Sequence, residues 1–210
     1  MKLYIYDHCP FCTRARMAFA LRELPVELTI LMEGDSDTPT RMVGKKVVPI
    51  LGKEDGSYMK ESLDIVHYVD RTGTPMFADP VVTEIDTWIK EVWPVAAKLF
   101  IPRFTQADFA ELSTPQARAA YRQREEEAFG DLDELMARTP DMLSEISPKM
   151  SELAQLLAQH QPTGITDILL WPVLRCLSIV KALPFPSAVR EYAERLEART
   201  GIPLLFNQAI

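Results

Sequence analysis

One stretch near the start of the chain decides the fold: Tyr4-Ile5-Tyr6-Asp7-His8-Cys9-Pro10-Phe11-Cys12-Thr13-Arg14. It predicts a buried strand, a tight turn and the first turn of a helix, because Pro10 suits the first helical position, where its missing N–H costs nothing. Cys9 is then the N-cap residue. Its sulfur can accept hydrogen bonds from the N–H groups of Phe11 and Cys12, and the helix dipole favours its thiolate. Cys12 lies on the same helical face, within reach for a disulfide. The stretch therefore predicts a nucleophilic thiol beside a resolving thiol.

Other uses of a Cys-x-x-Cys pair were compared with this interpretation. A structural zinc site needs about four ligands, and the chain offers only Cys176 and three histidines without ligand spacing among themselves (His8, His67 and His160). A structural disulfide across so short a loop stabilises little. Ligation of an iron–sulfur cluster by Cys9 of two chains is an alternative that the spacing leaves open. Redox chemistry explains the pair best, and we expect no metal.

The composition limits the class of protein. Of 210 residues, 47% are hydrophobic and 25% are charged, which is typical of soluble globular proteins. The net charge of −7 argues against nucleic acid or an anionic membrane as the main partner. Three cysteines do not make a secreted disulfide framework, the apolar run before Asp7 is too short for a signal peptide, and residues 168–174 are too few to span a bilayer. We expect a cytoplasmic protein.

The first third of the chain alternates between strand and helix patterns. We predict strands over 2–6, 26–31, 46–51 and 57–60, with Pro49 inside the third strand, and helices over 10–22 and 62–71, the second capped by Ser62. A short helical turn is expected over 40–44. The order β-α-β-(α)-β-β-α is that of a thioredoxin-like domain with a mixed four-stranded sheet, which we assign to residues 1–72. The dithiol lies beyond the carboxyl end of the first strand, where open α/β sheets place their sites.

The rest of the chain has only helical patterns. Residues 73–80 contain one glycine and two prolines and are predicted to be a linker, and 81–210 an all-helical domain. Helices are expected near 81–102, 114–138, 141–160, 166–182 and 187–200. Pro94 and Pro172 should kink their helices or delay the helix start. The run 125–127 of three glutamates is interpreted as a solvated face, and Cys176 as a core residue.

Two dipeptides complete the candidate site. A proline in a strand-like run cannot donate to the sheet, and a cis Val48-Pro49 bond beside the dithiol would leave the backbone of Val48 free to pair with an extended peptide. A trans proline at a sheet edge is the alternative. Glu61-Ser62 precedes a helix whose free N–H groups suit a carboxylate, while Glu61 could hold an ammonium group. A dithiol, a peptide-pairing backbone and a zwitterion site together suit glutathione.

The chain resembles the bacterial glutaredoxin 2 family, two-domain glutaredoxins whose fold is similar to that of glutathione transferases. The resemblance covers essentially the whole length and rests on residues 2–12, 38–44, 48–51 and 61–70, with later stretches such as 102–104 and 113–115. The Cys-Pro-Phe-Cys turn, a cis Val-Pro and Glu-Ser together are specific to the glutathione-linked branch.

The resemblance implies glutathione-dependent exchange with glutathionylated or disulfide-containing proteins. It implies that Cys9 attacks the disulfide and Cys12 resolves the protein adduct. Val48, next to Pro49, would pair with the cysteinyl backbone of glutathione, and Glu61 and Ser62 would bind its γ-glutamyl end. A cation is needed for the glycine carboxylate, and spacing does not choose among Arg14, Arg16, Lys45 and Lys46. Family analogy favours a monomer.

Two features depart from the family's usual pattern. Small glutaredoxins usually carry a lysine shortly before the first cysteine, whereas this chain has Asp7, whose charge should raise the pKa of Cys9 if it is close. His8 is expected to be a turn residue and not a catalytic base. In the helical domain, Gly164 stands where a Ser or Thr usually opens the central buried helix. Glycine is still an acceptable N-cap, so we expect this helix to form.

Two other functions stay open at this point. A cysteine-type glutathione transferase or dehydroascorbate reductase would use Cys9 alone, so Cys12→Ser would leave its activity unchanged. A non-enzymatic module that binds a protein partner would have an inert dithiol, and its Cys9 would react with iodoacetamide no faster than free cysteine.

Overall fold

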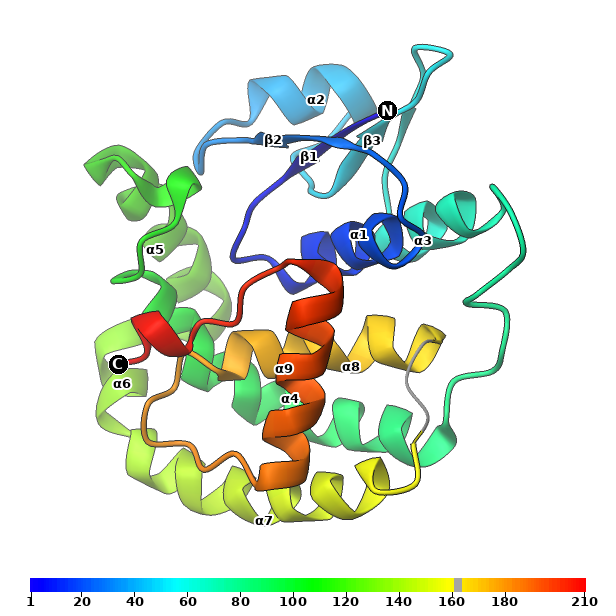
Figure 1. The fold of residues 1–210 in the computed structure, drawn as a ribbon. Coiled ribbons are helices and arrows are strands. Elements are labelled where there is room, and N and C mark those ends of the chain that lie inside the picture. Colours follow the sequence, from blue (N-terminus) through cyan, green and yellow to red (C-terminus); the bar gives the residue numbers. More distant parts are fainter. Residues whose placement is uncertain (161–163) are drawn as a thin grey trace.

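The N-terminal part forms a mixed four-stranded sheet with three helices (Figure 1). The computed structural model describes residues 1–160 and 164–210. In chain order the elements are β1 (Lys2–Ile5), α1 (Pro10–Leu21), β2 (Glu27–Ile30), α2 (Asp37–Val43), β3 (Ile50–Gly52), β4 (Tyr58–Met59) and α3 (Ser62–Asp70). The strand order is β2-β1-β3-β4, in which β1 and β2 are parallel and the other pairs are antiparallel. The thioredoxin-like prediction is confirmed.

Alternation along β1 fixes which face of the sheet is buried. Leu3 and Ile5 are fully buried, and Leu3 pairs across to the buried Leu51 on β3. α1 and α3 pack against each other and lie between the sheet and the helical part of the chain (Figure 1). The turn that carries Cys9 therefore leaves the sheet toward the second domain.

Helices make up the second part of the chain. They are α4 (Thr83–Phe104), the 3-10 helix η1 (Ala110–Leu112), α5 (Pro115–Phe129), α6 (Leu132–Ala137), α7 (Thr139–Leu157), α8 (Ile165–Leu177), α9 (Ser187–Thr200) and the 3-10 helix η2 (Phe206–Gln208). α8 is the central helix, because it packs on both α4 and α1 and nearly all of its side chains are buried. Its N-cap is Gly164, whose N–H donates to Asp167 Oδ2 at 2.9 Å, so the predicted glycine N-cap is confirmed.

Three predicted elements of the first domain are corrected by the structure. The third strand begins at Ile50, so Pro49 precedes the strand instead of lying inside it, as expected of a residue without an N–H. α2 begins at Asp37, three residues earlier than predicted, because Asp35 Oδ1 accepts the Thr38 N–H at 3.0 Å and the helix starts there. The N-cap of α3 is Glu61, and Ser62 is already helical.

Helix boundaries in the second domain also differ. The helix predicted over 114–138 is two helices, because Gly130 takes a φ of 83° after α5 and Asp131 then caps α6. α8 ends at Leu177, not at residue 182. α4 runs on through Pro94 and α8 through Pro172, so neither proline sets a helix start. Every described helix is too short or too polar to cross a bilayer.

Candidate functional site

The turn between β1 and α1 holds the two thiols of the Cys-Pro-Phe-Cys sequence. Cys9 is the N-cap of α1, with extended backbone angles of φ −73° and ψ 121°, and Pro10 follows at the start of the helix. The Cys9 carbonyl accepts the Thr13 N–H at 3.0 Å and the Thr13 hydroxyl at 3.1 Å. Cys9 is partly exposed, Cys12 is fully buried, and both are free thiols. The predicted N-cap position of Cys9 is confirmed.

The two thiols differ strongly in acidity. A hydrogen bond with the Cys12 thiol is the largest influence on the Cys9 pKa. Together with the charge of His8 and the backbone N–H groups of Cys12 and Phe11, it lowers this pKa from 9.0 to about 7 against the effect of burial. The sulfur makes no full cap hydrogen bond, so the amides contribute less than the sequence suggested. Burial raises the pKa of Cys12 well above 9.0. At neutral pH the Cys9 thiol is therefore partly ionised, and the Cys12 thiol keeps its proton.

Asp7 does not act on Cys9 as an unpaired charge. Its carboxylate accepts from Arg16 and, at 3.1 Å, from Arg175 on α8. Burial works to raise the pKa of Asp7, but the charges of Arg175 and Arg16 outweigh it and lower that pKa. The negative charge beside the dithiol is thus balanced by two guanidinium groups. The same pairing occupies Arg16, one of the four candidate cations.

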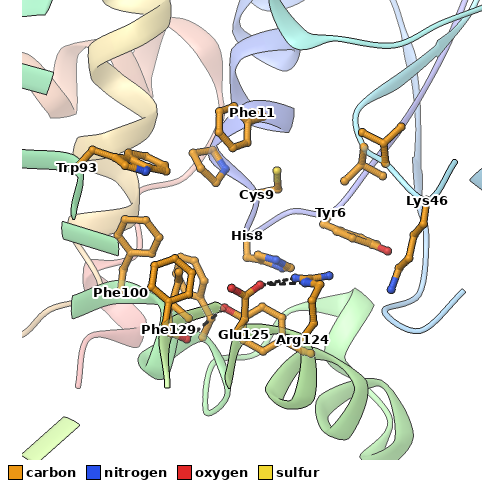
Figure 2. Close-up of a pocket in the computed structure, with 16 residues that line it drawn as sticks. Tyr6, His8, Cys9, Phe11, Lys46, Trp93, Phe100, Arg124, Glu125 and Phe129 are labelled. Atoms are coloured by element: carbon orange, nitrogen blue, oxygen red, sulfur yellow. Dashed lines mark hydrogen bonds and ion pairs between the residues drawn. The ribbon is translucent and has the colours of Figure 1, made fainter. Parts of the chain in front are cut away.

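A pocket of about 310 Å³ lies between the two domains, with Cys9 at its wall (Figure 2). One side is aromatic, where Phe11 faces Trp93 on α4 with ring centroids 5.9 Å apart. The other side is polar. The full lining comprises Tyr6, His8, Cys9, Pro10, Phe11, Lys46, Val47, Val48, Trp93, Phe100, Ile101, Phe104, Tyr121, Arg124, Glu125 and Phe129. The pocket can therefore take a partly apolar group attached to a sulfur that Cys9 contacts.

The predicted site residues fall into two groups. Cys9, Pro10, Phe11, Val48 and Lys46 line the pocket. The others lie outside its lining: Cys12, Arg14, Arg16, Lys45, Pro49, Glu61 and Ser62. The Val48–Pro49 peptide bond is cis, as predicted.

Glu61 and Lys45 form a separate polar patch near α3. Lys45 Nζ lies 3.4 Å from Glu61 Oε1, and more than half of each side chain is exposed. Glu61 has a φ of 69°, which is rare for a residue with a side chain and costs of order 1–3 kcal/mol, a strain that occurs mostly at functional sites. Ser62 follows as a buried residue in the first turn of α3. An exposed acid held in this geometry at a helix start suits a ligand that carries both charges.

His8 shows what sequence reasoning missed. It is a turn residue, as predicted, but its ring is buried, stacks on Tyr6 with centroids 5.6 Å apart, and places Nδ1 2.8 Å from Glu111 Oε1 on η1. Glu111 lies 103 residues away in the sequence. No local spacing predicts such a contact, and nothing in the sequence around residue 111 marks this glutamate as buried.

The glutamates at 125–127 are also corrected. Glu125 is not fully solvated, because it lines the pocket and accepts from Arg124 Nη2 at 2.7 Å (Figure 2). Arg124 Nη1 in turn donates to both oxygens of the buried Glu33 carboxylate, at 2.6 and 2.7 Å.

Cys176 is a buried core residue, as predicted, and burial raises its pKa to about 12. Among the described residues, no three His, Cys, Asp or Glu side chains are grouped to hold a metal ion.

Known proteins and family models match this chain along nearly its whole length. Residues 84–209 match the family model described as the C-terminal domain of glutaredoxin 2, and residues 3–74 match that of the glutathione S-transferase N-terminal domain. The chain is 42% identical to glutaredoxin 2 of Escherichia coli K12, covering 100% of both chains. A crystal structure of glutaredoxin 2 from Salmonella typhimurium in complex with glutathione has a TM-score of 0.96 and 40% identity, covering 100% of this chain and 98% of that one. A glutathione S-transferase domain-containing protein of Marinobacter aquaeolei, at 17% identity and TM-score 0.59 over 97% of this chain and 100% of that one, shares the fold.

Proposed function

This chain belongs to the glutaredoxin 2 family, and from that premise we propose that it is a glutathione-dependent thiol–disulfide oxidoreductase. Its substrates are glutathione mixed disulfides and protein disulfides, and its reductant is glutathione. The single observation that carries the proposal is the placement of the two thiols: Cys9 is the partly exposed N-cap of α1 at the pocket wall, and Cys12 is buried in the first turn of that helix. This placement lowers the pKa of Cys9 to about 7 and raises that of Cys12 well above 9.0. An attacking thiol works best when its pKa is near the ambient pH.

Each step balances in sulfur and electrons. The Cys9 thiolate attacks the glutathione sulfur of a mixed disulfide, a Cys9–glutathione disulfide forms, and the protein thiolate leaves with the electron pair of the broken bond. A second glutathione thiolate then attacks this adduct, which releases oxidised glutathione and the Cys9 thiolate. With a protein disulfide as substrate, the Cys9 thiolate attacks one sulfur and the other protein thiolate leaves. Cys12 then gives up its proton and attacks the Cys9 sulfur of this adduct, so that the second protein thiolate leaves. The resulting Cys9–Cys12 disulfide is reduced by two glutathione molecules.

The contacts proposed for glutathione follow the surface around Cys9. The backbone of Val48 on the pocket wall pairs with the cysteinyl unit, and Glu61 and Ser62 receive the γ-glutamyl ammonium and carboxylate. Lys46, which lines the pocket, is better placed for the glycine carboxylate than Arg16, which pairs with Asp7, or Lys45, which pairs with Glu61 at the proposed γ-glutamyl end. Arg14, whose guanidinium lies 4.8 Å from the centroid of the Phe11 ring, is the second choice. A dithiol used in this way requires a reducing compartment, which favours the cytoplasm.

Hydroxyethyl disulfide reduction by glutathione tests the proposal. We expect Cys9→Ser to be inactive and Cys12→Ser to keep substantial activity, because a mixed disulfide with glutathione can be resolved by glutathione itself. Reduction of a protein disulfide should fall sharply in Cys12→Ser, which separates this function from a transferase that uses Cys9 alone. Equal loss in both variants would contradict the roles assigned to the two thiols.

A further inference from the structure

The helical domain holds the backbone of the turn that leads into Cys9. Arg175 Nη1 on α8 donates to the Asp7 carbonyl at 2.7 Å, and the His8 N–H donates to Glu111 Oε1 on η1 at 2.9 Å. The Cys176 thiol, next to Arg175, lies 3.8 Å from the His8 carbonyl. Asp7 and His8, the two residues before Cys9, are thus hydrogen-bonded to side chains more than 100 positions away in the sequence.

The burial of Glu111 is unfavourable for the stability of the fold. Its side chain is fully buried, and Oε1 accepts both from the His8 backbone N–H and, at 2.8 Å, from Nδ1 of the His8 ring. Oε2 has no hydrogen-bond partner in the described part of the chain. Burying a carboxyl group with one oxygen left without a hydrogen-bond partner destabilises a fold, and an apolar residue would fill the space without that penalty. The residue therefore serves something other than stability.

Arg175 on α8 contacts the same turn at Asp7. It is also fully buried, and besides the Asp7 carbonyl it donates from Nη2 to Asp7 Oδ1 at 3.1 Å and from Nε to the Pro203 carbonyl at 2.8 Å. Two of its three hydrogen bonds go to one residue of the turn. Because its Nη1 and Nη2 atoms both donate to Asp7, the planar guanidinium fixes the orientation of Asp7 as well as its distance from α8.

We propose that Glu111 and Arg175 are positioning residues of the dithiol, which hold the Asp7–Cys9 turn so that the Cys9 sulfur stays aligned with its activating groups. The proposal rests on the function proposed above and adds to it, because it makes the helical domain part of the machinery that sets the reactivity of the thiol. Neither residue touches the reacting sulfur. Glu111 acts through the backbone N–H and the ring of His8, and Arg175 acts through the backbone carbonyl and the carboxylate of Asp7.

Several groups lie around the Cys9 sulfur and influence its ionisation. On α1 these are the Cys12 thiol, the N–H groups of Phe11 and Cys12, and the Arg14 guanidinium; on the turn, His8; and on α8, the Cys176 thiol. Hydrogen bonds weaken steeply with angle and length, so a turn that is free to shift loses part of this stabilisation of the thiolate. The thiolate fraction then falls at neutral and acidic pH, and it recovers once the pH exceeds the new pKa.

The test measures alkylation of Cys9 by iodoacetamide between about pH 6 and pH 9.5, in a Cys12→Ser background that keeps a hydrogen-bond donor at that position. In this background we compare Glu111→Ala, Glu111→Gln and Arg175→Met. Asp167→Asn is the matched control, because Asp167 is an equally buried carboxylate of the helical domain that bonds Tyr192 and Gly164 instead of the turn. Urea unfolding of each variant reports stability separately.

We expect Glu111→Ala and Arg175→Met to react about tenfold more slowly at low pH, which corresponds to a pKa higher by about one unit. The difference should narrow toward pH 9.5. Glu111→Gln, which keeps the acceptor for the His8 N–H, should recover most of the rate. Asp167→Asn should lose stability and keep the rate.

Three results would overturn the proposal. If Glu111→Ala and Arg175→Met react like the parent, the contacts do not position Cys9, although the proposed function stands. If Asp167→Asn slows alkylation as much as they do, the effect is general loss of stability. If the parent itself reacts no faster than free cysteine, there is no activated thiol to position, and the proposed function fails as well.

Discussion

The hydrogen bond from Cys12 to Cys9 should be measurable as a difference between two substitutions at Cys12. It is the largest influence on the Cys9 pKa and outweighs that of the helix amides. Cys12→Ser keeps a donor of similar reach, whereas Cys12→Ala removes it. A hydrogen bond to a charged group contributes about 1.5–3 kcal/mol, and each pKa unit corresponds to ~1.36 kcal/mol. The Cys9 pKa should therefore rise by about one to two units in Cys12→Ala, from about 7 toward 9.0.

Ultraviolet titration of the thiolate in the two variants is the direct assay. Cys176 is fully buried, and its pKa of about 12 keeps it out of the titration range, so the signal belongs to Cys9. We expect Cys12→Ser to titrate close to the wild-type value and Cys12→Ala well above it. If both variants titrate within a few tenths of a unit of each other, the helix amides and His8 provide the activation, and the reasoning about Cys12 is refuted.

Three further predictions concern stability and binding. Because folding lowers the pKa of Cys9 from 9.0 to about 7, the stability due to its thiolate is present above pH 9 and is lost as the pH falls through 7. The unfolding free energy of the reduced wild type relative to Cys9→Ser should thus rise by on the order of 2 kcal/mol between pH 6 and 9 in urea titrations, and a flat difference would contradict this. Arg124→Met removes Nη1, which donates to both carboxylate oxygens of the buried Glu33, and should lower the free energy of unfolding in urea by about 2 kcal/mol. The loss is smaller than for a fully buried pair because Arg124 is partly exposed, and a change near zero would contradict this prediction. Glu61→Gln should raise the KM for glutathione about tenfold or more and leave kcat nearly unchanged, since the proposed ammonium contact is made before and during the reaction alike; a loss in kcat alone would argue against that contact.

The first domain could be predicted almost completely from the sequence because its signals are local. Strand periodicity, Pro10 at a helix start and the Cys-x-x-Cys spacing each act over a few residues, and the structure places β1, α1 and the Cys9 N-cap as expected. The predicted helix boundaries were wrong where a single residue takes an unusual backbone conformation. Gly130 ends α5 by taking a positive φ, and Glu61 takes the cap position assigned to Ser62.

The environment of the dithiol could not be predicted, because it depends on contacts across the domain interface. Asp7 was expected to oppose the Cys9 thiolate, and only the fold shows that Arg175, 168 positions later, neutralises it. His8 likewise meets Glu111 across 103 positions. The sequence shows the charged residues that precede Cys9 in the chain, but it does not show that folding places Arg175 beside Asp7 and Glu111 beside His8.

In the proposed reaction, the Cys9 sulfur is the nucleophile that takes up glutathione. Mass spectrometry of the Cys12→Ser protein after exposure to oxidised glutathione detects this step, because the mixed disulfide persists when the second thiol is missing. We predict one glutathione per chain, located by peptide mapping on Cys9 and released by added glutathione. An adduct on Cys176, or no adduct at neutral pH, would contradict the account.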